Sequence, residues 1–375
     1  MTKTQAAVTR QPGGAFSVET IEVEPPRFGE VRVRIVGVGL CHTDLIFRDQ
    51  IAPFTLPGVL GHEGAGVIEA IGDGVEGLVI GDEVVIGFSS CGACPRCDEH
   101  LPSYCQNFIA LNYAGLRLED GSTAYASNGE RITSHFFGQS SFSALTVTRA
   151  RNVVKVDTSK VPLELLGPLG CGFLTGAGGV MNSLACQAGS SIVIFGGGPV
   201  GLAAVMAAKI QGCSTVILVE PISARREVGA ELGATHVVDP TAVRDLSAAL
   251  RDIVPTGLDF AFDTSGIVSV IEAGLSALGS HGAIGLVGVP SRPDAAINVN
   301  ITALMTPGHR IIGIIEGDSD PQRLIPELIA HHAAGRFPFD RLVKTFPLNR
   351  INEAVASQAR GECIKAVLIP EGGEM

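Results

Sequence analysis

The chain has 375 residues, of which 46% are hydrophobic and 17% charged. This length exceeds the size at which one hydrophobic core keeps growing, so we expect two folded domains. The formal net charge of -11 weighs against partnership with nucleic acid or an anionic membrane surface. Apolar runs are short or interrupted by glycine and proline, so we expect neither export nor a membrane span. Nine cysteines in such a chain indicate metal binding in the cytoplasm more than a disulfide framework.

The first 150 residues carry patterns typical of short strands separated by turns. Residues 30–36 alternate apolar and charged side chains with a period of two, as a half-exposed antiparallel strand does. We expect an irregular β-rich domain that carries functional side chains on its loops. Further strands are predicted at residues 15–18, 20–24, 64–69, 82–86 and 142–148.

Cys41 and His62 lie among glycines, and each is close to an acidic residue. A lone cysteine or histidine is more often an ordinary core residue, but a thiolate and an imidazole are also ligands of a zinc ion with an open position. A third ligand is then needed. Cys171, flanked by glycines that let the backbone approach a metal closely, is the candidate.

Four further cysteines follow the spacing C-x2-C-x2-C-x7-C, at Cys91, Cys94, Cys97 and Cys105. Four thiolates at this spacing can close a tetrahedron around zinc and leave no open position, which makes a structural site. An iron-sulfur cluster is the competing interpretation, since similar cysteine runs hold such clusters.

The pattern changes near residue 190. Residues 191–195 form a short apolar run typical of a buried parallel strand, and Gly196, Gly198 and Gly201 follow in the spacing G-x-G-x-x-G. A helix is predicted at 200–211 and a second strand at 215–219, which ends at Glu220. This order predicts a dinucleotide site in which the glycines approach the pyrophosphate and Glu220 binds the adenosine ribose.

Alternating strands and helices continue beyond Glu220. Strands are predicted at 236–239, 258–263 and 282–288, and Ser223 is the expected N-cap of a helix at 224–232. This alternation predicts an α/β domain with a doubly wound parallel sheet. Two more helices, at 321–334 and 351–359, and a last strand at 365–369 complete the expected elements.

The motifs together resemble the zinc-dependent alcohol dehydrogenases of the medium-chain dehydrogenase/reductase family, over essentially the whole chain. They are Cys41-His42-Thr43-Asp44, Gly-His62-Glu63-Gly-x-Gly and Gly-Cys171-Gly; Phe-Phe-Gly-Gln-Ser-Ser-Phe at 136–142 is similar to the benzyl-alcohol and geraniol dehydrogenase branch. The resemblance implies a GroES-like catalytic domain at 1–172 and 317–375 and an NAD-binding Rossmann domain at 173–316. It also implies a homodimer or homotetramer.

The resemblance implies a reaction as well. An NAD-dependent enzyme would oxidise a primary aryl or allylic alcohol to its aldehyde reversibly, with a catalytic zinc on Cys41, His62 and Cys171 and a structural zinc on the other four cysteines. Asp44 would orient a zinc-bound imidazole, and Glu63 would be an occasional ligand. Apolar residues near the motifs, at Phe54, Phe88, Val289 and Ile315, suit an apolar substrate.

Thr43 is expected to hydrogen-bond the alcohol oxygen and pass its proton toward the nicotinamide ribose. His42 resembles the family's pyrophosphate-contacting position, and Ile46 stands where many members have a histidine that ends the proton relay. Glu220 predicts NAD over NADP, although Arg225 and Arg226 follow within reach of a 2'-phosphate; Arg225 is also a candidate cofactor residue.

Two alternatives stay open. One is a dehydrogenase of the glutathione adduct of formaldehyde, S-hydroxymethylglutathione, which shares both zinc motifs and needs charged groups for glutathione. The other is a non-catalytic nucleotide-binding relative, against which the complete set of three ligands and Thr43 counts.

Overall fold

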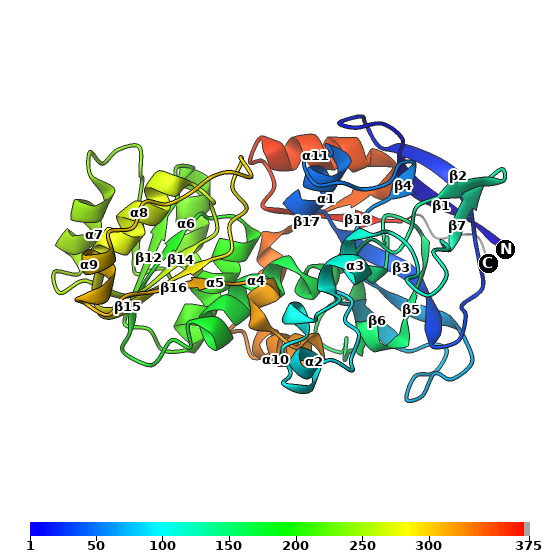
Figure 1. Ribbon diagram of the computed structural model, residues 1–375, viewed down its shortest axis with the longest axis horizontal. Helices are drawn as coiled ribbons and strands as arrows, with labels where there is room; N and C mark the ends of the chain where they lie inside the picture. The colour runs from blue at the N-terminus through cyan, green and yellow to red at the C-terminus, as the bar shows by residue number, and fades with distance from the viewer. Residues whose placement is uncertain (371–375) are drawn as a thin grey trace. The chain divides into compact units, whose positions relative to one another are not determined.

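The structure is a computed structural model that describes residues 1–370 (Figure 1). The chain divides into two compact units. Unit 1 comprises Met1–Gly172, Asp320–Gly335 and the described residues from Phe339 onward, and unit 2 comprises Phe173–Ser319 and Arg336–Pro338. None of the helices in the described part of the chain is long and apolar enough to cross a membrane.

Unit 1 is built mainly from strands, with short helices between them. Its strands are β1 (Thr2–Thr9), β2 (Ser17–Val23), β3 (Glu30–Gly39), β4 (Gly58–Val59), β5 (Gly64–Ile71), β6 (Glu83–Ile86), β7 (Tyr125–Ser127), β8 (Glu130–Ile132), β9 (Leu145–Arg149), β10 (Val153–Lys155), β17 (Val343–Pro347) and β18 (Lys365–Ile369). Its helices are α1 (His42–Arg48), α2 (Pro95–Asp98), α3 (Phe108–Tyr113), α10 (Pro321–Ala333) and α11 (Ile351–Ala359).

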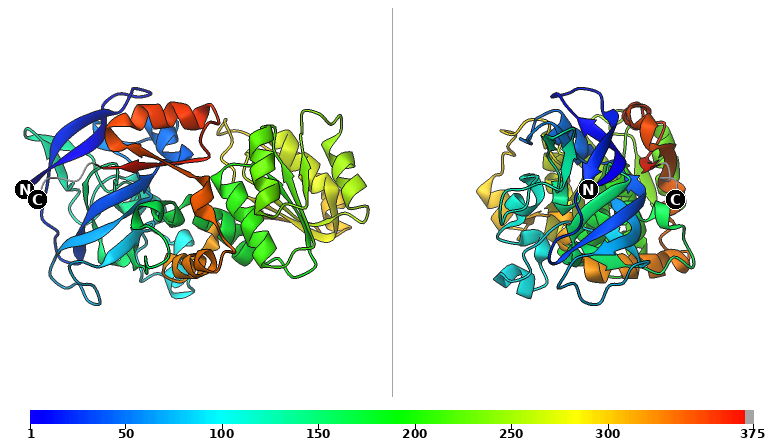
Figure 2. Two further views of the ribbon diagram at one scale, coloured as in Figure 1. Left: turned by 180° about the vertical axis from the view of Figure 1, so that it is seen from behind. Right: turned by 90° about the vertical axis from the view of Figure 1, so that its right-hand side faces the viewer.

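Two sheets organise unit 1. One has the order β4-β1-β2-β7-β8, and the other has the order β10-β6-β5-β3-β18-β17, with β9 also pairing with β3. In the second sheet β18, from the end of the chain, lies antiparallel to β3, from its beginning (Figure 2). Because β3 leads directly to Cys41, this pairing brings the C-terminal strand next to the first metal motif.

The strands of unit 1 differ from the sequence prediction near the N-terminus. The pattern predicts separate strands at 15–18 and 20–24, whereas the structure has the single strand β2, paired along its length with β1. Thr20 and Glu22 break the apolar pattern, but they lie on the accessible side of a strand whose other side carries the buried Ile21 and Val23. A polar outward-facing residue does not interrupt a ladder.

Unit 2 is a parallel sheet with helices. Its strands are β11 (Ser191–Phe195), β12 (Thr215–Val219), β13 (His236–Val238), β14 (Leu258–Asp263), β15 (Leu278–Leu286) and β16 (Arg310–Gly313). Its helices are α4 (Gly172–Gly178), which begins at the last residue of unit 1, α5 (Pro199–Ile210), α6 (Ser223–Leu232), α7 (Leu246–Ile253), α8 (Val268–Ala277) and α9 (Ile301–Met305).

The sheet of unit 2 has the order β13-β12-β11-β14-β15-β16, and all its pairs are parallel. One face of β11 is buried with α7 and α8 in a core that contains Val193, Phe195, Leu250 and Ile271. On the other face α5 packs against β11 and β12 and contacts α6. This is the doubly wound α/β fold that the alternating pattern predicts.

The start of α6 corrects one detail of the prediction. Ser223 is not the N-cap; it is the first helical residue, and the cap is Ile222, which has no side-chain acceptor. The Ile222 amide instead donates to Glu220 Oε1 at 2.9 Å. The carboxylate before the helix therefore replaces the serine as the capping acceptor.

Candidate metal centres and cofactor loop

The first motif residues come together at the end of β3 and the start of β5. Cys41 is the N-cap of α1, His62 lies just before β5, and Cys171 follows the short turn Gly167–Gly170. The ligand atoms of Cys41, His62, Glu63 and Cys171 all lie within 4.8 Å of one another. Glycine is required nearby: a Cβ on Gly39 would lie 1.8 Å from Glu63 Oε2.

Asp44 holds this cluster in place from α1. Its Oδ2 accepts the Cys41 amide at 2.9 Å, and its Oδ1 accepts the Gly61 amide at 3.1 Å. Asp44 Oδ1 also lies 2.8 Å from His62 Nδ1, with both side chains fully buried. A hydrogen on Nδ1 leaves a lone pair on His62 Nε2, which is buried without a hydrogen-bond partner in the described chain. This orphaned nitrogen fits a metal ligand.

The charges in the cluster also fit a cation. A hydrogen bond from Cys171 lowers the pKa of Cys41 well below its usual value, against the effect of burial and with help from His62. Burial opposes protonation of His62, yet Asp44 and Cys41 together raise its pKa well above the usual value. Excess negative charge gathers around a buried nitrogen and two sulfurs, which is the donor set of an open zinc site.

Lys365 also belongs to this site, although no sequence motif predicts it. Its Nζ lies 2.5 Å from Glu63 Oε2 and donates to the Leu40 carbonyl at 3.1 Å, and both charged side chains are almost inaccessible. Burial raises the pKa of Glu63, while the ammonium of Lys365 acts in the opposite direction. The only sequence signal is a lysine at the head of the apolar strand β18, a place where a charge needs a buried partner.

Aromatic side chains form one wall of the cluster. The Phe137 ring stacks on the His62 ring, with centroids 4.5 Å apart, and Phe136 meets it edge-on at 5.5 Å. Phe47 and Phe54 continue this wall around Phe136. Both phenylalanines of the Phe-Phe-Gly motif therefore pack against the imidazole.

Thr43 and His42 lie in the first turn of α1. Thr43 Oγ1 is 3.6 Å from Cys41 Sγ, so its hydroxyl borders the metal cluster. The side chain of His42 is exposed, whereas Ile46 is buried. Helix α1 therefore presents the Thr43 hydroxyl to the cluster. At position 46 it has the apolar side chain of Ile46, where many family members have a histidine.

The other four cysteines form a compact lobe around α2. The sulfur separations are 4.0 Å for Cys91 and Cys97, 3.6 Å for Cys94 and Cys97, and 4.0 Å for Cys94 and Cys105. A tetrahedral zinc with Zn–S bonds of about 2.3 Å separates its sulfurs by about 3.8 Å. These separations fit one ion held by four thiolates, and they favour it over a multi-iron cluster, whose thiolates bind different irons.

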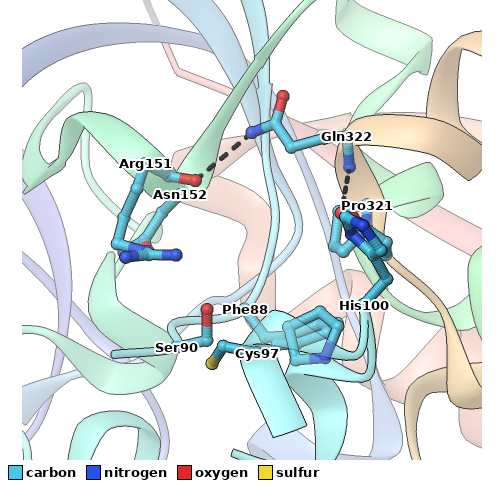
Figure 3. A pocket seen from close by; sticks show the side chains of 10 residues that line it. Phe88, Ser90, Cys97, His100, Arg151, Asn152, Pro321 and Gln322 are labelled. Carbon is cyan, nitrogen blue, oxygen red and sulfur yellow. Dashed lines mark hydrogen bonds and ion pairs between the residues drawn. The ribbon is translucent and has the colours of Figure 1, made fainter. Parts of the chain in front are cut away.

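A cavity of about 200 Å³ borders this lobe (Figure 3). Cys97 and Arg151 lie on its wall, and Arg151 donates to the Cys91 carbonyl at 2.9 Å. Opposite them, Gln322 at the start of α10 donates to the Arg151 carbonyl at 3.2 Å. None of the lining residues belongs to the Cys41 cluster, so we connect this cavity with the attachment of the lobe to α10 and assign it no substrate.

The glycine-rich turn of unit 2 has the geometry of a close backbone approach. Gly196 has a φ of 101°, and a Cβ on Gly201 would lie 1.8 Å from the Gly196 carbonyl oxygen. Gly198 is the N-cap of α5 and has open space beside it. Glu220, which directly follows β12, accepts the Gly197 amide at 2.6 Å. The turn therefore points its backbone at the place where a pyrophosphate can meet the helix N-terminus.

The two arginines after Glu220 have different surroundings. Arg226 donates to the Glu220 and Pro221 carbonyls and lies 3.1 Å from Asp239. Arg225 lies beside Gly197, and its Nε is buried without a partner in the described chain. Arg226 is thus engaged within the fold, whereas the Nε of Arg225 has no partner among the described residues.

Comparison with known proteins decides the family. Residues 27–158 match the family model described as "Alcohol dehydrogenase GroES-like domain", and residues 199–331 match "Zinc-binding dehydrogenase". Geraniol dehydrogenase of Castellaniella defragrans is 46% identical over 97% of this chain and 97% of its own length. The chain belongs to the zinc-dependent medium-chain alcohol dehydrogenases. The prediction from the sequence motifs is confirmed.

Solved alcohol dehydrogenase structures agree with this assignment. An alcohol dehydrogenase zinc-binding domain protein from Burkholderia ambifaria superposes with a TM-score of 0.96 at 47% identity, over 99% of this chain and all of that one. Benzyl alcohol dehydrogenase from Acinetobacter calcoaceticus superposes with a TM-score of 0.94 at 40% identity, over 99% of this chain and 100% of that one. Within the family, the alcohol dehydrogenase described here lies in the branch that contains geraniol and benzyl alcohol dehydrogenases.

The expected substrate residues lie on both units of this alcohol dehydrogenase. Phe54 and Phe88 are buried in unit 1, where Phe54 belongs to the aromatic wall. Val289 and Ile315 lie in unit 2, and Val289 is 57% exposed. Their role in substrate binding stays a prediction.

Proposed function

We propose that this alcohol dehydrogenase oxidises primary aryl or allylic alcohols, of the benzyl alcohol and geraniol type, to aldehydes with NAD. The main support for this proposal is the cluster of Cys41, His62 and Cys171. In it the Nε2 of His62, which has no hydrogen-bond partner, lies near two sulfurs, and aromatic rings pack against the imidazole. The geraniol and benzyl alcohol dehydrogenases among its relatives support this substrate class.

The chain's own residues supply position and charge. Cys41, His62 and Cys171 would hold a zinc ion, which would act as a Lewis acid that favours loss of the alcohol proton, and the nicotinamide would supply the hydride acceptor. We assign Thr43, whose hydroxyl lies beside the cluster, to accept that proton while it passes its own hydroxyl proton on toward the nicotinamide ribose. Asp44 fixes the imidazole tautomer, and Glu63, held by Lys365, is the acid that can approach the metal.

We propose NAD as the preferred cofactor and assign it to unit 2. Gly196, Gly198 and Gly201 would admit the pyrophosphate, and His42 is proposed as a further cofactor residue. Glu220 would bind the ribose hydroxyls and Arg225 would contact the adenosine end. The buried carboxylate of Glu220 supports NAD, because it repels the 2'-phosphate of NADP. Cys91, Cys94, Cys97 and Cys105 would hold a structural zinc, for two zinc ions per chain.

We propose that unit 1 corresponds to the catalytic domain and unit 2 to the cofactor domain, with boundaries near 172 and 317.

Self-association into a homodimer or homotetramer is proposed as well, because Ile301 and Met305 on α9 are 79% and 70% exposed. We place the protein in the cytoplasm, since none of its nine cysteines, all within the described residues, forms a disulfide.

The test compares kcat/KM for benzyl alcohol, geraniol, ethanol and S-hydroxymethylglutathione with NAD. We expect kcat/KM for benzyl alcohol and for geraniol to exceed that for ethanol by at least about tenfold. This is on the order of the gain from one additional apolar group that fills a pocket. A preference for S-hydroxymethylglutathione would support the alternative glutathione-adduct dehydrogenase. Failure of all four substrates with metal-loaded protein would contradict the proposed function.

A further inference from the structure

Three successive residues of unit 2 adopt left-handed backbone. Glu316, Gly317 and Asp318 have φ values of 51°, 63° and 49°. Left-handed backbone is disfavoured for residues that carry a Cβ, as Glu316 and Asp318 do. The turn directly contacts the helical segment that begins with α4: a Cβ on Gly178 would lie 2.4 Å from the Gly317 carbonyl oxygen. The surrounding structure therefore enforces the turn.

The turn buries a carboxylate. Glu316 is 8% exposed, and its Oε2 accepts a hydrogen bond from Thr175 Oγ1 at 3.4 Å. Thr175 lies on α4, four residues after Cys171. A strained backbone that carries a buried acid is costly to the fold, so it is expected at a functional position more than at a neutral one.

The sheet topology relates Glu316 to one half of the cofactor. Glu316 follows the end of β16 by three residues, on the side where the carboxyl ends of the parallel strands meet. In a doubly wound dinucleotide domain each half of the sheet takes one mononucleotide. Glu220 at the end of β12 marks the adenosine half, so β14, β15 and β16 form the nicotinamide half. Glu316 lies on that half.

We propose that Glu316 is a specificity-determining residue that favours the oxidised nicotinamide cofactor over the reduced one. This inference rests on the proposed function. The nicotinamide ring carries one positive charge in NAD⁺ and none in NADH, while the rest of the molecule is unchanged. A carboxylate near the ring therefore changes the ratio of the two affinities, whereas groups that contact only the pyrophosphate or the adenosine change both equally.

The expected size follows from Coulomb's law. Two unit charges about 6 Å apart at an effective dielectric of about 20 change an affinity by about a hundredfold, and screening by solvent and salt reduces this to roughly tenfold. A lower Kd for NAD⁺ relative to NADH lets the oxidised cofactor occupy the site more readily when both forms are present, while the overall reaction equilibrium is unchanged.

The experiment measures Kd for NAD⁺ and for NADH by calorimetry, without alcohol, in the wild type and in Glu316→Gln. We expect the ratio Kd(NAD⁺)/Kd(NADH) to rise about tenfold in Glu316→Gln and to stay near the wild-type value in Glu316→Asp, which keeps the charge. Asp318→Asn is the matched control on the same turn and should change the ratio less than threefold. ADP-ribose, which lacks the nicotinamide, should bind all variants equally.

A ratio within twofold of the wild type in Glu316→Gln, with ADP-ribose binding retained, would overturn the proposal. Equal losses for NAD⁺, NADH and ADP-ribose would overturn it too, since they indicate a purely structural role. Glu316→Gly provides a second variant if Glu316→Gln does not fold, because glycine accepts the left-handed backbone without strain. A wild type that turns over no alcohol while the ratio still shifts would contradict the proposed alcohol oxidation but not the proposed use of NAD, which is the part of the proposed function on which this inference rests.

Discussion

His62 Nδ1 and Asp44 Oδ1 lie 2.8 Å apart in a fully buried contact. The same carboxylate accepts the amides of Cys41 and Gly61. The Asp44 side chain therefore fixes the tautomer of His62 and the backbone of Cys41. It also holds the turn at Gly61 that leads into His62. Asp44 thus connects the His62 imidazole with the backbone on both sides of the cluster.

Asp44→Asn should weaken zinc binding at the Cys41 cluster by about 10- to 100-fold, because an amide holds the imidazole less strongly and with no charge. Competition with a chelator of known affinity measures this. Asp49→Asn, at the exposed C-terminal end of the same helix, is the control and should leave zinc affinity unchanged. Equal affinity in Asp44→Asn and the wild type would show that Asp44 does not support the ligand.

Thr43→Ala should lose about 10²- to 10⁴-fold in kcat, the usual range for removing a group that transfers a proton. Thr43→Ser should keep most of it, since only the hydroxyl beside Cys41 is required. The two variants are compared under conditions where hydride transfer limits the rate, checked with deuterated benzyl alcohol. Wild-type kcat in Thr43→Ala under those conditions would remove Thr43 from the proton path.

Glu220→Ala should reduce the preference for NAD over NADP on the order of a hundredfold, as expected for removing a like charge a few ångströms from the 2'-phosphate. The ratio of kcat/KM for the two cofactors measures this preference. Some stability should also be lost, because Glu220 accepts the Gly197 and Ile222 amides. A wild type that prefers NADP, or an unchanged ratio in the variant, would show that another residue discriminates.

His135 should make the protein less stable as the pH falls. Burial, with Arg117 nearby, lowers the pKa of His135 to about 3, so the native ring stays neutral while the unfolded ring takes up a proton below about 6.5. The stabilisation present above that pH is lost progressively toward pH 3, by about 2 kcal/mol between pH 7 and pH 5. Urea unfolding should show this loss in the wild type and not in His135→Asn.

Asparagine is chosen for this variant because His135 has a φ of 60°, a backbone that asparagine accepts. His236→Asn, which removes an exposed histidine, is the control and should keep the wild-type pH dependence. The same loss of stability in His135→Asn as in the wild type would assign the effect to other groups.

The local motifs were predictable from the sequence because their chemistry depends on residues that are close in the chain. The strand-glycine-helix order around Gly196 predicts β11 and α5 almost to the residue, since a buried parallel strand and a tight turn leave a strong pattern. The spacing from Cys91 to Cys105 likewise predicts a four-sulfur cluster, which the structure forms.

Residues that act through long-range pairing could not be predicted in the same way. Lys365 meets Glu63 only because β18 pairs with β3, across more than 300 residues of chain, and nothing local encodes that register. The stacking of Phe137 on His62 depends on a left-handed backbone at Phe137 that no sequence pattern announces. Ser223 has the residue type of an N-cap, but the Glu220 carboxylate accepts the Ile222 amide at the start of α6.

The most direct test counts zinc per chain by elemental analysis in the wild type, Cys171→Ser and Cys94→Ser, alongside NADH formation from benzyl alcohol. Two zinc ions are predicted in the wild type. Cys171→Ser should keep the structural zinc, remain folded and lose turnover, whereas Cys94→Ser should lose mainly thermal stability. One zinc in the wild type, or wild-type turnover in Cys171→Ser, would contradict the account.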